Sequence, residues 1–384
     1  MNNRQAWNVI TLFLLMIFGV AVISLIIPKR SFSETENRTL AGLPKADIGD
    51  ILSGKFEQDY EEYLTDQFPW RDWWISLKTR AEKTILKKDI HDVYLAKDDY
   101  LIEKHTGVFE ADRAEINIKA LASFAGSMSG RFGPEHVSVM IVPNAVDILR
   151  DKLPAFADPY DEETYLKKIE EALPEGVWFD TAGILEKHKD EYIYYRTDHH
   201  WTTPAASYVC AAWAGNKLGE PLGEGYFFSQ ELSDNFQGTI ASRTGISSIS
   251  DVLTWYRPAG SDRIKVTYPS SGAERDGILD HDKLTTRDQY GVFFGGNYDL
   301  VRVKTDASTG RRLLMFKDSY AHCFAPMLTG LFDEIDLVDL RYYSGDIDEL
   351  IEESDPTDIL FLYNAAGFAE DAGVSRLSSY EGQQ

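Results

Sequence analysis

Two short segments of the chain concentrate side chains that could carry out acyl transfer. The first is Asp198-His199-His200-Trp201, in which two histidines follow a carboxylate, and the second is Lys317-Asp318-Ser319. A serine hydroxyl is a weak nucleophile at neutral pH and needs a base, which a histidine can provide. That histidine in turn needs an acidic partner to hold its tautomer. The two segments together supply all three residue types.

Spacing alone leaves several interpretations open. Asp198 and His200 are two residues apart, so their side chains share one side of an extended segment and His199 points away. A metal site formed by Asp198, His199 and His200 is an alternative, although no further histidine or cysteine lies nearby to complete the ligand set. Ser319 would alternatively serve only as a helix cap. His322 is a third option for the base, three residues after Ser319 on the same helix face.

Alternating strands and helices predict how these segments are positioned. Strands are expected at Val137–Val142, Val177–Asp180, Leu313–Phe316, Ile335–Leu340 and Ile359–Tyr363. Helices are expected at about 111–128, 161–172, 204–217 and 346–353, and one after Ser319. This alternation predicts an α/β fold with a parallel sheet and right-handed crossovers. Ligands bind at the carboxyl ends of such strands, where Ser319 and Asn364 fall.

Residues 222–310 differ in composition, being rich in glycine, serine, threonine, aspartate and aromatic residues. They contain short β-like runs at Ile264–Tyr268, Val292–Phe294 and Leu300–Lys304. We therefore expect a β-rich insertion within a catalytic domain that spans residues 91–384.

The N-terminus carries an uncharged apolar run, Trp7–Ile27, which is long enough as a helix to cross a bilayer. The run is long for a cleaved signal peptide, so residues 1–30 are expected to be a retained membrane anchor with an exported body behind it. Residues 31–90 form a linker and two amphipathic helices broken near Pro69. Their aromatic cluster, Phe68, Trp70, Trp73 and Trp74, is expected to be a buried helix face, with carbohydrate stacking as the alternative.

Composition narrows the function further. The 384 residues carry a net charge of −23, which argues against nucleic acid as a partner. Two cysteines, Cys210 and Cys323, exclude a disulfide-rich scaffold. No phosphate-binding glycine loop is visible, and neither a cofactor nor a metal is expected.

The segment Asp198-His199-His200-Trp201 resembles the signature of the DHHW family, which is named for it. More broadly, the chain resembles alginate O-acetyltransferase proteins of the AlgJ and AlgX type, which carry an Asp-x-His-Trp motif and a later Asp-Ser motif. Further similarities are Glu36-Asn37-Arg38, the aromatic stretch ending at Phe68 and Arg71, and Lys97-Asp98-Asp99-Tyr100-Leu101. The resemblance covers most of residues 30–365.

The resemblance implies an SGNH-hydrolase-like domain with its motifs in permuted order. Ser319 would be the nucleophile, His200 the general base and Asp198 its orienting acid. The implied activity is acetyl transfer to hydroxyls of an extracellular polysaccharide, with a membrane-bound O-acyltransferase as the partner that supplies the acetyl group. An acetyl esterase with the same triad, or a catalytically silent carbohydrate-binding scaffold, are the alternatives.

One residue departs from the family pattern, because the usual Gly-Asp-Ser reads Lys317-Asp318-Ser319 here. Relatives also use an arginine after the next strand, and Arg341 fits that position, where it would polarise an acyl or sugar oxygen or simply be solvated. Asn297 and Asn364 are candidates for the remaining oxyanion donors. Trp201 is a candidate substrate contact.

Overall fold

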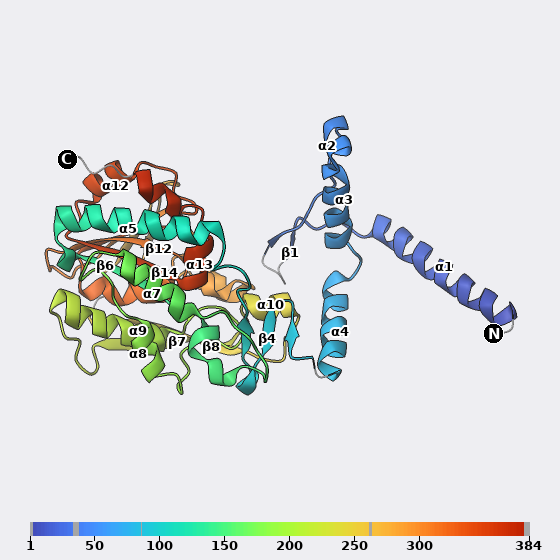
Figure 1. The fold of residues 1–384 in the computed structure, drawn as a ribbon, viewed down its shortest axis with the longest axis horizontal. Helices are drawn as coiled ribbons and strands as arrows, with labels where there is room; N and C mark the ends of the chain where they lie inside the picture. Colours follow the sequence, from blue (N-terminus) through green and yellow to red (C-terminus); the bar gives the residue numbers. More distant parts are fainter. Residues whose placement is uncertain (1–2, 34–37, 86, 261–262, 380–384) are drawn as a thin grey trace. The chain divides into compact units, whose positions relative to one another are not determined.

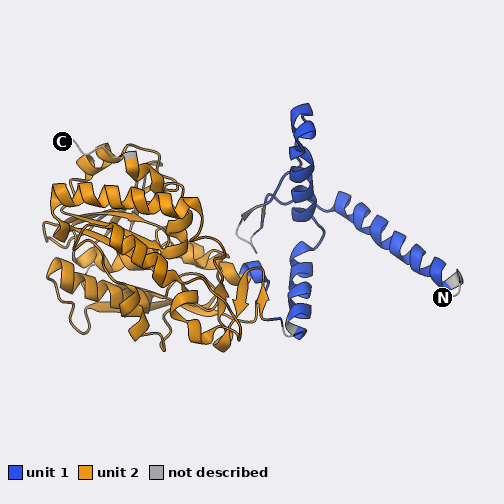
Figure 2. Ribbon diagram, in the orientation of Figure 1, with its two compact units in different colours: residues 1–87, 242–246 blue, residues 88–241, 247–384 orange. Residues whose placement is uncertain are grey.

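The computed structural model describes residues 3–33, 38–85, 87–260 and 263–379 (Figure 1). Two compact units share these residues (Figure 2). Unit 1 comprises residues 1–87 with 242–246, and unit 2 comprises residues 88–241 with 247–384. Glu36 and Asn37, from the segment Glu36-Asn37-Arg38 that resembles the AlgJ and AlgX proteins, lie outside the described residues.

Unit 2 is built on a seven-stranded mixed sheet, in which both sequence segments with candidate chemistry are positioned. In spatial order its strands are β10 (Ala273–Asp276), β9 (Lys265–Tyr268), β11 (Leu300–Lys304), β13 (Glu334–Val338), β12 (Arg312–Lys317), β14 (Asp358–Asn364) and β6 (Val137–Val142).

The expected parallel arrangement holds for four strands. β13, β12, β14 and β6 pair in parallel, whereas β11, β9 and β10 pair antiparallel at the other side of β13. Val177–Asp180 does not form the expected strand, since only an isolated bridge joins Trp178 to Val139. The sheet is therefore longer and more mixed than the sequence predicts.

Helices cover both faces of the sheet and bury β12 on both sides. Leu313 and Met315 pack into one apolar cluster with α9, and Leu314 and Phe316 pack into a second with α5. The α9 face also holds α8 and α11, and the α5 face holds α7, α12 and α13 (Figure 1). The bounds are α5 (Asp112–Phe132), α6 (Ala145–Ile148), α7 (Glu162–Ala172), α8 (Ala182–Lys187), α9 (Thr203–Trp213), α11 (Ala321–Phe324), α12 (Ile347–Ser354) and α13 (Ala365–Glu370).

The region expected as a β-rich insertion is distributed between two structures. β7 (Phe227–Phe236) and β8 (Asp251–Pro258) form a separate antiparallel ribbon, with α10 (Thr239–Thr244) between them. β9, β10 and β11 instead extend the main sheet. Val292–Phe294 is not a strand, because a 3₁₀ helix, η6 (Gln289–Val292), ends at its first residue and Phe293 forms only an isolated bridge with Leu279.

Smaller elements complete unit 2. A three-stranded sheet consists of β3 (Asp89–Ile90), β4 (Val93–Leu95) and β5 (Leu101–Glu103). Single turns of helix connect the larger elements; they are η1 (Lys97–Asp99), η2 (Pro134–His136), η3 (Arg150–Lys152), the π-helix η4 (Ala214–Leu218), η5 (His281–Thr285), η7 (Ala325–Gly330) and η8 (Val374–Ser379).

Unit 1 is helical apart from a two-stranded pair. Its elements are α1 (Asn3–Ile26), β1 (Phe32–Ser33), β2 (Arg38–Thr39), α2 (Ile48–Ser53), α3 (Lys55–Asp66) and α4 (Arg71–Thr84). Gln5–Ile26 is long and apolar enough to cross a membrane by length and composition. The aromatic cluster differs from expectation, because Trp70, Trp73 and Trp74 are exposed rather than buried.

Candidate active site

Ser319 lies on the turn that follows β12, at the carboxyl edge of the parallel strands. The carboxylate of Asp318 shapes this turn. Its Oδ1 accepts the backbone N–H of Tyr320 at 2.8 Å. Its Oδ2 accepts the backbone N–H of Asn364 at 2.8 Å and the Asn364 side-chain amide at 2.6 Å. Asp318 therefore joins the ends of β12 and β14, and Ser319 is left half-buried with its side chain available.

Asp198 and His200 reach Ser319 from the irregular segment before α9. His200 Nε2 lies 2.7 Å from Ser319 Oγ, and His200 Nδ1 lies 2.5 Å from Asp198 Oδ1. The second carboxylate oxygen of Asp198 accepts the backbone N–H of Thr239 at 2.9 Å and its hydroxyl at 3.2 Å. The three residues expected to act together therefore form one continuous hydrogen-bonded chain.

The electrostatics of this chain suit a base that is neutral at rest. Burial lowers the pKa of His200 to about 4, the charges of His199 and Arg341 act in the same direction, and Asp198 opposes them. Burial alone would raise the pKa of Asp198, but the charges of His199 and His200 and the hydrogen bonds it accepts hold that pKa below its usual range. At neutral pH the site therefore holds a neutral imidazole beside an ionised carboxylate.

Tyr290 is a part of the site that sequence reasoning missed. Its ring stacks on the His200 imidazole with centroids 3.9 Å apart and an interplanar angle of 15°. Its hydroxyl donates to the backbone carbonyl of Ser319 at 3.4 Å. Because Tyr290 lies in η6, far from both motifs in sequence and without a motif of its own, no local signal marks it.

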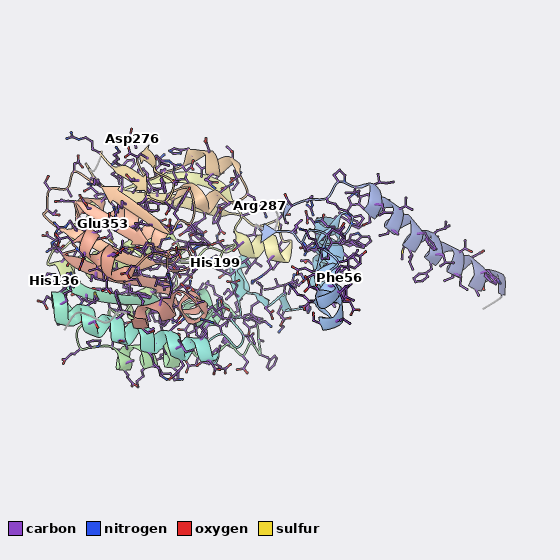
Figure 3. The ribbon with its side chains drawn as sticks, turned by 90° about the horizontal axis from the view of Figure 1, so that it is seen from above. Phe56, His136, His199, Asp276, Arg287 and Glu353 are labelled. Carbon is purple, nitrogen blue, oxygen red and sulfur yellow. The ribbon has the colours of Figure 1, made fainter. Side chains whose placement is uncertain are left out.

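His199 does not point away from Asp198, although its position in an extended segment predicts that it would, and its side chain is 29% exposed. Its Nδ1 lies 3.0 Å from the hydroxyl of Thr239, and its ring contacts His200 with centroids 3.9 Å apart (Figure 3 labels His199). Asp198, His199 and His200 offer ligand atoms within 4.8 Å of one another. A metal would compete with the triad there, because both nitrogens of His200 already face Asp198 and Ser319.

The loop that carries His200 is held by hydrogen bonds to the buried carboxylate of Asp251. It accepts the backbone N–H groups of Arg196 and Thr197 at 2.9 and 2.8 Å, and the Thr197 hydroxyl at 2.5 Å. The Tyr192 hydroxyl donates to it at 2.5 Å. The family-like segment 97–101 also holds this loop, since Leu101 N–H donates to the Arg196 carbonyl at 2.9 Å.

Lys317, which replaces the usual glycine, is buried in an ionic network. Its Nζ lies 3.0 Å from His322 Nε2 and 3.2 Å from Asp339 Oδ2. Arg341 donates to both oxygens of Asp339, at 2.8 and 2.6 Å. Burial lowers the pKa of Lys317, and the charge of Asp339 opposes that change. His322, the alternative base, is thus engaged by Lys317 rather than by the Ser319 hydroxyl.

The four candidate oxyanion or substrate-binding residues occupy different environments. Arg341 lies close enough to the triad for its charge to act on His200. Asn364 is committed to the turn, because its side-chain oxygen accepts from Asn144 at 3.0 Å and its amide donates to Asp318. Trp201 is fully buried and donates to the Tyr320 carbonyl at 2.9 Å, so it positions the Ser319 turn and does not face substrate. Asn297 is exposed, and no hydrogen bond within the described residues joins it to the triad.

A cleft of about 610 Å³ opens beside Arg341, at the carboxyl ends of β13 and β14. Arg341, Tyr342, Gly367, Glu370 and Arg376 are among its lining residues. Tyr342 presents an exposed aromatic ring there, and Gly367 packs directly on Asp318 and Asn364.

Comparisons with known proteins support the resemblance. The sequence model of the DHHW protein family matches residues 128–338. A DHHW family protein from Eubacterium siraeum is 24% identical, with a TM-score of 0.61 over 75% of this chain and 96% of that chain. Bacillus cereus PatB1 carrying a sulfonyl adduct is 18% identical, with a TM-score of 0.62 over 75% of this chain and 99% of that chain.

A weaker similarity exists to the O-acetyltransferase domain of Pseudomonas putida AlgJ, which is 13% identical with a TM-score of 0.47 over 75% of this chain and 98% of that chain. No curated protein sequence matches this chain significantly.

Proposed function

The chain belongs to the DHHW protein family, and we propose that it is a membrane-anchored enzyme that transfers acetyl groups to hydroxyls of an extracellular polysaccharide. The observation that carries this proposal is the hydrogen-bonded chain from Ser319 Oγ through His200 to Asp198, with distances of 2.7 and 2.5 Å. Acyl transfer through a covalent intermediate requires a nucleophile that is hydrogen-bonded to a neutral base, and an ionised acid that orients this base.

In the first half-reaction, His200 Nε2 accepts the Ser319 hydroxyl proton as Oγ attacks the carbonyl carbon of an acetyl donor. The imidazolium that forms is stabilised by Asp198, which stays ionised. The backbone N–H of Ser319 forms no hydrogen bond within the described residues and can donate to the developing oxyanion. Collapse of the tetrahedral intermediate returns the proton from His200 to the leaving group and leaves an acetyl ester on Ser319.

In the second half-reaction, a sugar hydroxyl replaces the leaving group. His200 takes the proton of that hydroxyl, its oxygen attacks the acetyl carbonyl, and the proton returns to Ser319 Oγ as the acetylated sugar departs. Water in place of the sugar would make the same site an esterase. Exclusion of water by the bound acceptor therefore decides between transfer and hydrolysis.

The cleft beside Arg341 is the proposed acceptor site. It has the volume that a short saccharide needs, and Tyr342 offers the kind of exposed ring on which a sugar face stacks. Arg341 would donate to a sugar or acyl oxygen with the guanidinium face that Asp339 leaves free. Because the chain carries a net charge of −23, we propose a neutral or locally cationic acceptor.

The proposed location is the cell membrane, with unit 2 outside. α1 supplies one apolar helix near the N-terminus, which suits either a signal anchor or a signal peptide, and its length favours the anchor. An enzyme outside the membrane has no cytosolic acetyl donor at hand. We therefore propose a membrane-bound O-acyltransferase as the partner that delivers the acetyl group.

The decisive experiment traps the acetyl-enzyme. Purified full chain is incubated with a chromogenic acetyl ester and analysed by peptide mass spectrometry, alongside Ser319→Ala and His200→Ala. We expect acetyl release and a Ser319-linked acetyl group in the wild type, and a loss of at least about a thousandfold in both variants. Ser271→Ala and His281→Ala, at exposed positions of unit 2, serve as matched controls and should retain full activity.

Two readouts decide between the alternatives. A sulfonyl fluoride should label Ser319, as PatB1 carries a sulfonyl adduct in its structure. Addition of soluble oligosaccharides should divert acetyl groups from water to sugar if the chain is a transferase. Equal activity in the wild type, Ser319→Ala and His200→Ala would refute the triad, and a wild type that neither releases acetyl nor reacts with the sulfonyl fluoride would favour a scaffold.

A further inference from the structure

The helix α4 in unit 1 leaves most of its large apolar side chains exposed. Its packed face is largely polar, since Thr79 is 2% exposed and its hydroxyl donates to the Thr244 carbonyl at 2.6 Å. Ser76, about one turn away, packs against Gly245 together with the half-buried Ile75. A packed face formed by threonine, serine and one isoleucine buries little of the apolar surface of this helix.

The opposite face of α4 is apolar and exposed. Trp73 and Trp74 are 57% and 46% exposed, Leu77 is also exposed, and Trp70 just before the helix is 61% exposed. At a helical spacing of 3.6 residues, positions 70, 73, 74 and 77 lie on one stripe. Exposed apolar residues that occur singly need no explanation, but three tryptophans on one stripe indicate a surface that meets another phase or molecule.

The charge of this segment also departs from the rest of the chain. Residues 71–88 contain six basic side chains and two acidic ones, a net charge of +4, whereas the whole chain has −23. Lys78, Arg80, Lys87 and Lys88 are exposed. An apolar tryptophan stripe flanked by lysine and arginine has the composition of a helix that lies in a bilayer interface, with its cations near anionic headgroups.

Contacts within unit 1 tie the start of α4 to the end of the apolar helix α1. The Arg30 backbone N–H donates to Gln67 Oε1 at 3.0 Å, and the Gln67 amide donates back to the Arg30 carbonyl at 2.8 Å. The Arg30 guanidinium pairs with Asp72, on the first turn of α4, at 3.0 Å. Arg30 is four residues beyond Ile26, where α1 ends, and four residues of chain span at most about 14 Å. If α1 spans a membrane, the tryptophans are therefore held close to the membrane surface at which α1 ends.

We propose that α4 is an interfacial membrane-binding helix, with the stripe Trp70, Trp73, Trp74 and Leu77 seated among phospholipid headgroups and the outer acyl carbons. This inference rests on the proposed retention of α1 as an anchor. The occupant is the lipid surface because α1 brings that surface to α4 and because the positive flank matches anionic phospholipid. Tryptophan suits the headgroup level of a bilayer, since its ring is apolar and its N–H can form a hydrogen bond with water or a headgroup.

The proposal is tested on the full chain reconstituted in vesicles of phosphatidylcholine with about 30% phosphatidylglycerol, a fraction chosen to give the anionic surface required. The lipids carry bromine at a shallow acyl position, which quenches tryptophan fluorescence on contact. The Trp7→Phe protein is the reference, because Trp7 in α1 would itself be quenched. We expect strong quenching of this reference, and loss of most of it when Trp70, Trp73 and Trp74 are all changed to glutamine.

A matched control and two contrary outcomes complete the test. Trp178→Gln, in unit 2, should leave the brominated-lipid quenching unchanged. Equal quenching in the reference and in the triple variant would overturn the proposal, as would a response of the emission to added polysaccharide instead of to brominated lipid. Circular dichroism checks that the triple variant is folded.

Two further measurements distinguish a failure of the membrane-binding proposal from a failure of the proposed acetyl transfer. The intact mass of the chain extracted from membranes shows whether residues 1–30 are retained, which tests the anchor alone. Acetyl release by the triple variant with a soluble ester tests the triad alone and should be unchanged, because no residue of α4 belongs to the active site.

Discussion

His200 Nε2 lies 2.7 Å from Ser319 Oγ, although 119 residues separate them in the chain. The proximity follows from two constraints that act on different segments. The Asp318 carboxylate fixes the turn after β12 by bonding to Asn364, and Asp251 fixes the loop that carries His200. The geometry on which the proposed mechanism rests is therefore held by the carboxylates of Asp318 and Asp251, neither of which forms a hydrogen bond with Ser319 Oγ or a nitrogen of His200 within the described residues.

The pH dependence of acetyl release should report the low pKa of His200. Burial lowers this pKa to about 4, and only the neutral imidazole can accept the Ser319 proton. Activity should therefore rise with pH through a midpoint near 4 and be flat from about 6 to 8, where an unperturbed histidine would still be titrating. A stopped-flow pH profile with a chromogenic acetyl ester measures this. A midpoint near 6.5 would contradict the assigned environment.

Asp251→Asn should lower turnover without abolishing the fold. Arg196 N–H donates to Oδ1 of Asp251 and Thr197 N–H donates to Oδ2, so the amide keeps an acceptor for only one of these two donors. Loss of a buried hydrogen bond to a charged group costs about 1.5–3 kcal/mol, so the free energy of unfolding in urea should fall by that amount. The kcat should fall while KM for the ester stays constant, because the substituted residue orients the base. Asp276→Asn, on β10 at an exposed position, is the control and should change neither quantity.

Asp339→Asn should destabilise the protein more than Asp251→Asn. Asp339 is fully buried and neutralises Lys317, whose side chain is also buried. Removing one partner of a buried ion pair leaves an uncompensated charge and costs about 3–5 kcal/mol. The double variant Lys317→Met/Asp339→Asn removes both charges and should recover most of the stability in urea unfolding. No recovery in the double variant would show that Asp339 acts chiefly through Arg341.

Glu162→Gln should remove a pH-dependent loss of stability. Glu162 is buried, and burial raises its pKa from 4.5 to about 8, while its Oε2 accepts the Asn144 backbone N–H at 2.9 Å. The folded state keeps a proton that the unfolded carboxyl releases, so stability falls as pH rises from about 4.5 to about 8. The glutamine variant should unfold at higher urea than the wild type at pH 9 and at similar urea at pH 5. Glu163→Gln, the exposed neighbour, should behave as the wild type at both values.

The sequence predicts the elements that carry chemistry better than those that complete the sheet. β6 was predicted at the observed residues, because an apolar run bounded by a proline is a strong signal for a strand buried on both faces. β9 and β11 were recognised as β-like, but their antiparallel pairing with the main sheet depends on partners that local patterns do not specify. The sequence prediction that the tryptophans of α4 are buried is wrong, since amphipathicity does not reveal which face of a helix is packed.

The same limit applies to the site. Ser319, His200 and Asp198 could be nominated because their residue types and the family resemblance agree. Tyr290, Asp251 and Asp339 could not, because each acts through a tertiary contact across dozens of residues. Trp201, which the sequence analysis gives as a candidate substrate contact, instead donates its indole N–H to the Tyr320 carbonyl.

Gly367→Ala should impair catalysis by displacing the nucleophile turn. A Cβ at this position would lie 2.5 Å from Asn364 Nδ2 and 2.9 Å from Asp318 Oδ2, closer than packed atoms allow. Asn364 and Asp318 shape the turn that carries Ser319, so we expect relief of the clash to move these side chains and with them the serine. We expect a decrease in kcat of at least about tenfold, since small displacements of a catalytic group are costly. Gly130→Ala, on α5 with no atom within 4 Å of the added Cβ, should leave kcat unchanged. Equal kcat for both variants would show that the Asp318–Asn364 contact does not position the nucleophile.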